Sequence, residues 1–367
     1  MTRVVEQTTS DQPIVSVAMI AYNRELLIAQ AIESVLMQET AFTVELVIGE
    51  DCSTDGTRRI VQAYAEKYPN VIRPLLHEKN LGLSRNFAAV WRACLGKYIA
   101  WLDADDYWRT PQKLQKQVSL MEANPHYSLC GTSTQFVTTS TDGTEKDAGV
   151  FEPAVSKSEY DLADFLTGYP MHICSMLGRR ELVVLPDWLS DAGMLCDACT
   201  LALYAEKGPV GYLSEPMSCW RLHTGASWTT KPAPYQLQCN QKAIDLLDSH
   251  FGGRYHRLLR SREQKVWSTS LRSVTERGNY REARSLYWQS ASRLVCLMPL
   301  KVLALGVAAY GGYWCVNHWN KLTMSLAIRT RVRRLIGRLR AAPTKAAPQA
   351  EAHRAEQAYR VPPTRCD

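Results

Sequence analysis

Three carboxylates follow directly on one apolar segment of this sequence. Residues 98–102 read Tyr-Ile-Ala-Trp-Leu and run into Asp103, Asp105 and Asp106. Because like charges repel and ionised carboxylates are unfavourable beside apolar residues, such a cluster needs a cation or several hydrogen-bond donors. Mg²⁺ and Mn²⁺ prefer oxygen ligands and commonly hold substrate phosphates. The cluster indicates either a divalent-metal site for a phosphate-bearing ligand or a solvated acidic turn before the next helix.

The segments around this cluster alternate between two kinds of apolar pattern. Short apolar runs predict strands, and apolar residues at helical spacing between them predict helices. The strands are expected at 14–21, 42–49, 71–76 and 98–102, and the helices at 26–36, at 57–68 and after residue 80. This order predicts an α/β fold with a mostly parallel sheet, in which ligands bind at the carboxyl ends of the strands. Each polar cluster follows such an end.

Four motifs in register resemble the signatures of the family 2 glycosyltransferases. They are Val15-Ser-Val17 with Tyr22-Asn-Arg24, Glu50-Asp51-Cys-Ser53-Thr-Asp55-Gly56, Asn80-Leu-Gly82 with Arg85-Asn86, and Leu102-Asp103-Ala-Asp105-Asp106. The resemblance covers about the first 230 residues. It implies the GT-A fold, a Rossmann-like nucleotide-binding domain with a mixed, mostly parallel sheet and helices on both faces, followed here by a C-terminal helical appendage. It also implies inverting transfer of a sugar from a nucleotide-sugar donor.

The resemblance assigns the first three motifs to the nucleotide of the donor. Tyr22 would stack on the base, Asp51 would accept its N3 hydrogen, and Arg85 would bind the pyrophosphate, with Arg24 and Ser53 beside them. Simpler roles stay open. Tyr22 could be ordinary packing, Arg85 a surface ion pair, and Asp51 a helix cap, although Ser53 suits a cap better.

The fourth motif and a later Arg-x-His pair are implied to handle the metal. Asp105 would bind Mg²⁺ or Mn²⁺, Asp103 would contact the ribose or sugar hydroxyls of the donor, and Asp106 would hold the loop. Arg221 and His223 match the family's spacing. His223 would ligate the metal or touch the diphosphate of the donor, and Arg221 would add positive charge near it. Residues two apart on a strand share a face, so these two can converge on one ligand. A purely structural histidine is the alternative.

The general base is implied at the family's acidic pair, which opens a helix. This sequence has Cys196-Asp197 there, so the first acid is missing and Asp197 is the candidate base. Its alternative role is a helix cap, and Asp191 is the reserve candidate. Cys196 and Cys199 form a Cys-x-x-Cys without a second pair at zinc spacing. The eleven cysteines are otherwise scattered, as reduced core thiols would be.

Beyond the catalytic region the composition changes. The expected organisation is an N-terminal extension (1–13), the glycosyltransferase domain (14–231), a helical region (232–294), apolar and basic membrane-associating helices (295–340) and a disordered tail (341–367). Within the apolar stretch near residue 300, Pro299 and Lys301 interrupt what could otherwise be a membrane span. Residues 329–340 form a basic amphipathic segment, which favours an anionic membrane surface.

The net charge of +7 is concentrated in the C-terminal part, which favours a membrane surface over a nucleic-acid partner. The N-terminus carries acids and no apolar core of a secretory signal, and the cysteine pattern suits a reducing compartment. We therefore expect a cytoplasmic protein, peripheral at the membrane, with a single span as the lesser alternative.

The expected activity is metal-assisted, nonprocessive transfer with inversion to a hydroxyl acceptor, a glycan or a lipid-linked acceptor of surface polysaccharide. No Gln-x-x-Arg-Trp motif of processive members is present. Two rivals stay open: a catalytically silent nucleotide-sugar-binding scaffold, and a nucleotidyltransferase of related fold, although residues 21–24 are not the glycine-rich loop that the latter needs.

Overall fold

A computed structural model describes residues 12–139, 144–223, 228, 230–279, 281–283 and 285–286. The chain divides into two compact units, one up to residue 226 and one from residue 227. The predicted membrane-associating segment 295–340, the tail 341–367 and residues 1–11 of the N-terminal extension lie outside the described residues. In the part of the chain that the structure describes, no helix has the length and apolar character needed to cross a membrane.

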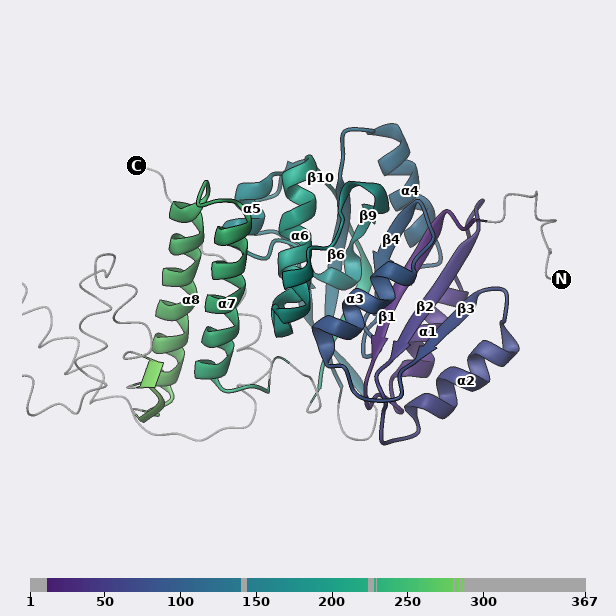
Figure 1. Cartoon of the computed structure of the whole chain (residues 1–367), viewed down its shortest axis with the longest axis horizontal. Helices are drawn as coiled ribbons and strands as arrows, with labels where there is room; N and C mark the ends of the chain where they lie inside the picture. Colours follow the sequence, from purple (N-terminus) through teal and green to yellow (C-terminus); the bar gives the residue numbers. More distant parts are fainter. Residues whose placement is uncertain are drawn as a thin grey trace, which may run out of the picture. The chain divides into compact units, whose positions relative to one another are not determined.

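The first unit is built on one sheet with helices on both of its faces (Figure 1). Its strands are β1 (Val15–Ala21), β2 (Val44–Glu50), β3 (Ile72–Leu76), β4 (Tyr98–Trp101), β5 (Tyr107–Trp108), β6 (Leu129–Thr139), β7 (Glu145–Phe151), β8 (Glu159–Tyr160), β9 (Leu177–Arg179) and β10 (Val210–Leu222). Its α-helices are α1 (Ile28–Leu36), α2 (Thr57–Lys67), α3 (Leu83–Ala93), α4 (Lys113–Ala123), α5 (Leu162–Thr167) and α6 (Cys196–Lys207). The short 3₁₀ turns are η1 (Ile173–Ser175), η2 (Arg180–Leu182), η3 (Asp187–Asp191) and η4 (Gly193–Leu195).

The sheet is mixed and mostly parallel, which confirms the predicted fold class. The strand order is β3-β2-β1-β4-β9-β6-β10-β5. β1 runs parallel to both β2 and β4, and β10 runs parallel to β6, whereas β9 is antiparallel to its two neighbours. The carboxyl ends of β1, β2 and β4 therefore share one edge of the sheet, and the loops with the polar motifs leave from that edge.

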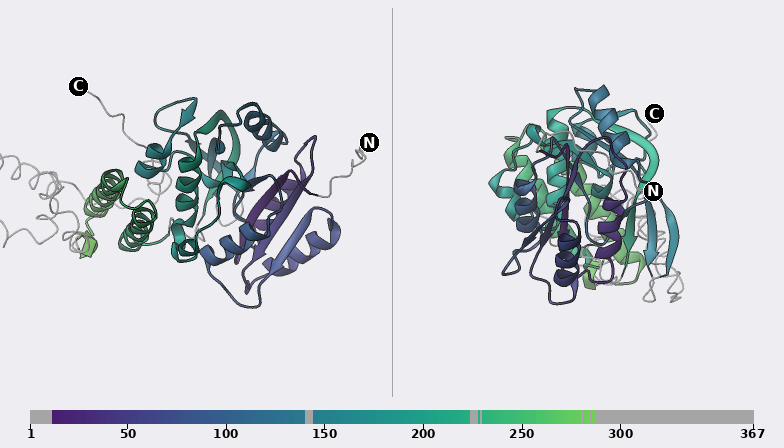
Figure 2. Two further views of the ribbon diagram at one scale, coloured as in Figure 1. Left: turned by 45° about the horizontal axis from the view of Figure 1, so that its top comes forward. Right: turned by 90° about the vertical axis from the view of Figure 1, so that its right-hand side faces the viewer.

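Two apolar layers cover the sheet. On one face, buried residues of β1 and β2 pack with α1, α2 and α4 in a single cluster that includes Ile32, Val61 and Leu114. On the other face lies an aromatic group from α3, β4 and α6, in which the Trp91 and Trp101 rings stack at 5.6 Å and Tyr204 meets Trp101 edge-on at 5.7 Å. The further views in Figure 2 show the same sheet between its helices. With both faces covered, the open positions are left at the strand ends.

One predicted strand is mostly a turn. The apolar residues 171–179 of the sequence predict a strand, but the chain forms η1 at 173–175 before the three residues of β9. The His172 side chain accepts a hydrogen bond from the Cys174 backbone N–H at the start of η1. This local bond competes with extended pairing, as side-chain caps do.

Beyond residue 232 the sequence predicts helices at 236–248, 254–277 and 281–293, and the second unit contains the first two of them. These are α7 (Ala233–His250) and α8 (His256–Glu276). Their contact is built on a cluster with Leu237, Trp267 and Leu271, and the Trp267 indole donates to the Leu286 carbonyl at 3.0 Å. Of the helix predicted at 281–293, residues 281–283 and 285–286 are helical and residues 287–293 lie outside the described part.

Lys113 at the start of α4 is fully buried, which is unusual for a lysine. Its ammonium lies 4.3 Å from the centre of the Trp108 ring and donates to Gln117 Oε1 at 2.6 Å. Burial lowers the pKa of Lys113 to about 7. Below this pH the folded protein carries a buried charge, and between about 7 and the unfolded value of 10.5 only the unfolded chain binds the proton. Stability contributed through Lys113 therefore rises with pH across this window.

Lys113→Met is expected to stabilise the protein most at low pH. Methionine has a similar length and no charge, so it removes the penalty of the buried ammonium. The advantage in free energy of unfolding over wild type should shrink by about 2 kcal/mol between pH 6 and pH 9. Denaturant titrations at both pH values measure this difference, and Lys116→Met, an exposed lysine of the same helix, is the control. A difference that does not change with pH would contradict the buried charge.

Candidate functional site

The loop after β4 holds the three aspartates at the carboxyl edge of the sheet. The backbone N–H of Leu102 donates to the Ala18 carbonyl at 3.1 Å, and that of Ala104 donates to the Ile20 carbonyl at 3.3 Å. These bonds continue the pairing with β1 beyond the end of β4. The loop is thereby fixed against the carboxyl end of β1, next to the first polar motif.

Asp105 lies between a guanidinium and an imidazole from distant parts of the sequence. Its Oδ2 accepts from Arg24 Nε at 2.9 Å and lies 3.2 Å from His223 Nε2. Burial would raise the pKa of Asp105, but the hydrogen bond from His223 and the charge of Arg24 outweigh it and lower the pKa below its usual value. The sequence resemblance paired Asp105 with His223, and the structure brings the two side chains together across 118 residues.

Asp103 faces the other acids of the site. Burial and the charges of Asp105 and Asp197 raise its pKa, and the Arg24 charge opposes this only in part. Asp197 is therefore close enough to Asp103 to act on it electrostatically, although 94 residues separate the two in sequence. The charge of the candidate base thus acts on Asp103 of the aspartate loop.

Asp197 stands in the first turn of α6, as predicted, and is partly exposed. Its Oδ2 accepts a hydrogen bond from the Tyr169 hydroxyl at 2.7 Å. That hydroxyl in turn accepts from the Ile173 backbone N–H at 3.1 Å. The carboxylate is therefore held by a tyrosine whose own position is fixed by the backbone of η1. The reserve candidate Asp191 is exposed at the end of η3.

Arg221 is buried and holds four parts of the unit together. Its Nε donates to Glu145 Oε1 at 2.7 Å, its Nη1 donates to the Asp105 carbonyl at 3.0 Å, and its Nη2 donates to the side-chain oxygen of Gln30. The guanidinium also lies 4.4 Å from the centre of the Tyr107 ring. Arg221 and His223 do converge on one residue, Asp105, but Arg221 does so through the backbone. Arg221 therefore supports the backbone of the aspartate loop and does not contact the Asp105 carboxylate through its guanidinium.

The first two loops are tied to each other, and one aromatic side chain is left exposed. The Ser53 hydroxyl accepts from the Asn23 backbone N–H at 3.0 Å, and the Asn23 side chain accepts from the Thr54 N–H at 2.9 Å. Asn23 and Cys52 both have positive φ, 53° and 58°, a conformation that this loop geometry requires and that few side chains adopt. Tyr22 is 43% exposed beside them. Ser53 therefore organises the loop on which Tyr22 stands.

Asp51 and Arg85 both act near the start of α3, but in different ways. Asp51 is buried, and its two carboxylate oxygens accept the backbone N–H groups of Leu81 and Gly82 at 2.7 and 2.9 Å. It therefore fixes the loop before α3. Arg85 is exposed in the first turn of that helix. The base contact of Asp51 and the pyrophosphate contact of Arg85 stay predictions.

The acids of the loop fit a hard divalent cation. Asp103, Asp105 and Asp106 can each place a carboxylate oxygen within 4.8 Å of the others. Oxygen ligands at such spacing suit Mg²⁺ or Mn²⁺, and the imidazole of His223 adds a nitrogen ligand beside Asp105. Asp105 and His223 are the side chains that would hold the ion. The charge that the ion supplies would be added to that of Arg24.

Several residues of this site have no motif in the sequence. Tyr169, which holds Asp197, and Gln30 and Glu145, which hold Arg221, are single polar residues within otherwise ordinary segments. Only their contacts reveal them. Glu145 begins the second strand of the β6–β7 hairpin, and nothing in the sequence distinguishes it there from a polar residue that faces solvent.

The fold is therefore a mostly parallel α/β sheet with acidic and basic side chains at its carboxyl edge. Residues 16–184 match the family model described as Glycosyl transferase family 2. The part of the chain that these residues form is therefore similar to this family.

The chain is also similar to two curated proteins and one solved structure. An uncharacterized protein of Mycobacterium tuberculosis is 32% identical over 213 residues, which are 58% of this chain and 60% of the relative. The putative teichuronic acid biosynthesis glycosyltransferase TuaG of Bacillus subtilis is 39% identical over 148 residues, 40% of this chain and 55% of the relative. This chain thus spans about three fifths of the length of the first relative.

The solved structure is a mannosyltransferase of Pyrobaculum calidifontis in complex with GDP-Man and Mn²⁺. It aligns with a TM-score of 0.48 and 16% identity over 90% of this chain and 86% of that chain.

Proposed function

We propose that the protein transfers a sugar from a nucleotide-diphosphate-sugar donor to a hydroxyl acceptor, with inversion, in a metal-assisted and nonprocessive reaction. The observation that carries the proposal is the meeting of Asp105, Arg24 and His223 with Asp103 and Asp197 at one edge of the sheet. Cationic groups and acids in one partly buried site suit a reaction in which a diphosphate leaves and a hydroxyl attacks.

The donor is bound by the first three loops. Tyr22, exposed and held by the Asn23–Ser53 contact, stacks on the base, and Asp51 holds the neighbouring loop in place and meets the base edge. Arg85 binds the pyrophosphate, since a guanidinium fork matches phosphate oxygens. Asp103 accepts hydrogen bonds from hydroxyls of the ribose or the sugar.

The leaving diphosphate is stabilised beside Asp105. Mg²⁺ or Mn²⁺, when bound, neutralises charge on the diphosphate as the glycosidic bond breaks. Asp105 and His223 orient the ion, and Arg24, fixed on Asp105 Oδ2 at 2.9 Å, adds a permanent positive charge. Arg221 keeps the loop rigid through the Asp105 carbonyl.

The acceptor is activated by Asp197. Its carboxylate takes the proton of the acceptor hydroxyl, and the Tyr169 bond at 2.7 Å holds it in the orientation for that step. A single inverting displacement needs a base on the opposite side of the reacting carbon from the leaving group, and we assign that role to Asp197. We place the acceptor among glycans or lipid-linked precursors of a surface polysaccharide, reached from an anionic membrane surface at the cytoplasmic face.

A thermal-shift screen with nucleoside diphosphates, each with and without Mn²⁺, tests the proposal. One diphosphate is expected to raise Tm in the presence of Mn²⁺, because a ligand at 100 times its Kd stabilises by about 2.7 kcal/mol. Subsequent release of that diphosphate from the matching nucleotide-sugar measures turnover. If no diphosphate shifts Tm with or without Mn²⁺, the proposed donor site is wrong.

A further inference from the structure

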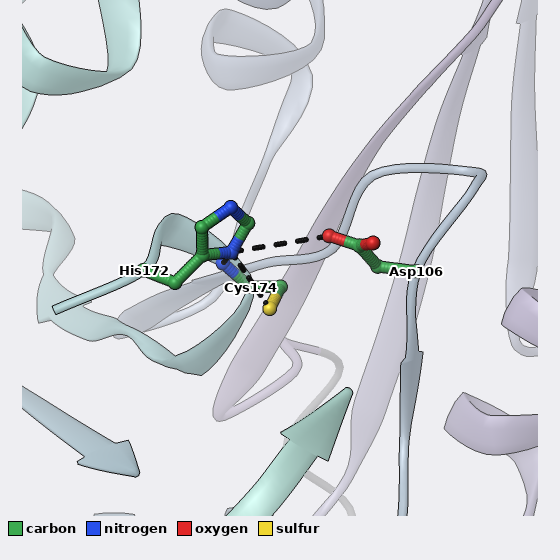
Figure 3. Close-up of side chains that lie close together, drawn as sticks. All are labelled: Asp106, His172 and Cys174. Atoms are coloured by element: carbon green, nitrogen blue, oxygen red, sulfur yellow. Dashed lines mark hydrogen bonds and ion pairs between the residues drawn. The ribbon is translucent and has the colours of Figure 1, made fainter. Parts of the chain in front are cut away.

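Asp106, His172 and Cys174 form a second group of metal-type ligands behind the aspartate loop. All three are buried, with 2%, 7% and 0% of their surface exposed. In Figure 3 one ring nitrogen of His172 faces both of the other side chains. This atom, Nδ1, lies 3.0 Å from the Cys174 sulfur and 3.9 Å from Asp106 Oδ2. One ligand atom from each residue fits within 4.8 Å of the other two.

We infer that this group binds one divalent transition-metal ion of intermediate softness, of which Zn²⁺ is the type, at a site separate from the hard-metal site at Asp105 and His223. Nitrogen, sulfur and carboxylate oxygen together are the donors of zinc sites in proteins. Tetrahedral zinc places such donors about 3.4 to 3.6 Å apart. The two separations measured from Nδ1 lie on either side of this range, and each needs a shift of about half an ångström.

The neighbours of the three side chains already orient them toward one another. The Arg221 backbone N–H donates to Asp106 Oδ1 at 3.0 Å. The Trp220 ring stacks on the His172 ring at 4.2 Å and 21°. The Trp108 indole fixes the Cys174 backbone by donating to its carbonyl at 2.9 Å. Metal sites in proteins depend on such supporting contacts for ligand orientation.

The protonation of His172 leaves the facing nitrogen able to bind a metal. A backbone N–H can only donate, and that of Cys174 points at Nδ1 at 3.4 Å. Nδ1 therefore carries the lone pair, and the ring proton is on Nε2. A neutral imidazole is the form that coordinates metals, and a metal ion at Nδ1 would replace the hydrogen bond from the Cys174 N–H.

Charge balance gives a reason for the burial of this group. One divalent cation with one thiolate and one carboxylate has no net charge, so the complex can be buried at a lower cost than either anion alone. On binding, the thiol proton is released to solvent as the sulfur–metal bond forms. The ion would join the aspartate loop to η1, which lie far apart in sequence.

Cobalt titration of the full-length, chelator-treated protein tests the site. Excess Mg²⁺ occupies the hard-metal site, and Co²⁺ serves as the probe because a thiolate ligand gives it a charge-transfer band in the near ultraviolet. We expect the band to saturate at about one equivalent of Co²⁺ per chain. The band should be lost in Cys174→Ser and kept in Cys196→Ser, which removes one cysteine of the Cys-x-x-Cys pair. His172→Gln should weaken Co²⁺ binding roughly tenfold or more.

Each other outcome overturns the inference. Absence of the band in the wild-type protein shows that no thiolate binds the metal. A band that survives Cys174→Ser, or that disappears in Cys196→Ser, assigns the metal to other cysteines. If Cys174→Ser fails to fold, X-ray absorption of the cobalt-loaded wild-type protein tests the site instead. We expect one sulfur neighbour of the cobalt, with nitrogen and oxygen as its other neighbours. Only oxygen neighbours, or two sulfur neighbours, would exclude the site.

Discussion

Asp197→Asn is expected to lower kcat for sugar transfer by ~100- to 10,000-fold, the range in which a general base contributes. Asparagine has the same size and can still accept from the Tyr169 hydroxyl, but it cannot take a proton from the acceptor. The KM for the donor should change little, because donor binding is assigned to other loops. Initial rates at saturating donor and acceptor measure the effect.

Two further variants sharpen this test. Tyr169→Phe removes only the hydroxyl that holds Asp197 Oδ2 and should reduce kcat by roughly tenfold, as expected for one hydrogen bond to a charged group. Asp191→Asn, an exposed acid a few residues before the helix, should leave kcat unchanged. Equal activity of Asp197→Asn and wild type would exclude Asp197 as the base, and a loss at Asp191→Asn instead would transfer the role to that residue.

Asp105→Asn is expected to lower kcat by ~100-fold or more and to weaken the dependence of the rate on Mn²⁺. The substitution removes the charge that holds the ion and that pairs with Arg24 and His223. Rates measured against Mn²⁺ concentration give both quantities. Circular dichroism checks that the variant folds, since Arg24 loses a charged partner.

A double-mutant cycle of Asp105→Asn and His223→Gln tests whether the two residues bind one shared ion or act independently. If Asp105 and His223 bind the same metal, the loss in the double variant should be clearly smaller than the product of the two single losses. Losses that multiply would mean that His223 acts elsewhere, and rates unaffected by Asp105→Asn would remove the metal site from the aspartate loop.

The sheet and its polar edge were predictable because they rest on repeated patterns. Runs such as residues 14–21 and 42–49 are apolar enough to be buried strands, and the polar motifs follow their ends. The contact between Asp105 and His223 was also predictable, because both residues belong to motifs with a fixed order. Asp197 at the start of α6 followed from the same order.

Other features depend on tertiary contacts that leave no pattern in the sequence. Arg221 was predicted near the diphosphate, yet its guanidinium is occupied by Glu145, Gln30 and the Asp105 carbonyl. A motif specifies the residue type but not which of its groups faces the ligand. The turn η1 was mistaken for strand because the bond from the Cys174 N–H to the His172 ring is local and independent of hydrophobic pattern.

The Arg221 contact limits how the protein can be redesigned. Glu145 opens β7, in the hairpin with β6, and its carboxylate holds both the Arg221 guanidinium and the Tyr107 hydroxyl. An exchange of this hairpin for that of another family member, made to alter acceptor choice, would also remove a support of the aspartate loop. Such chimeras must keep an acid at position 145. In a chimera without this acid, a change intended to alter the acceptor would also disturb the aspartate loop, and the result would be mistaken for a defect in donor binding.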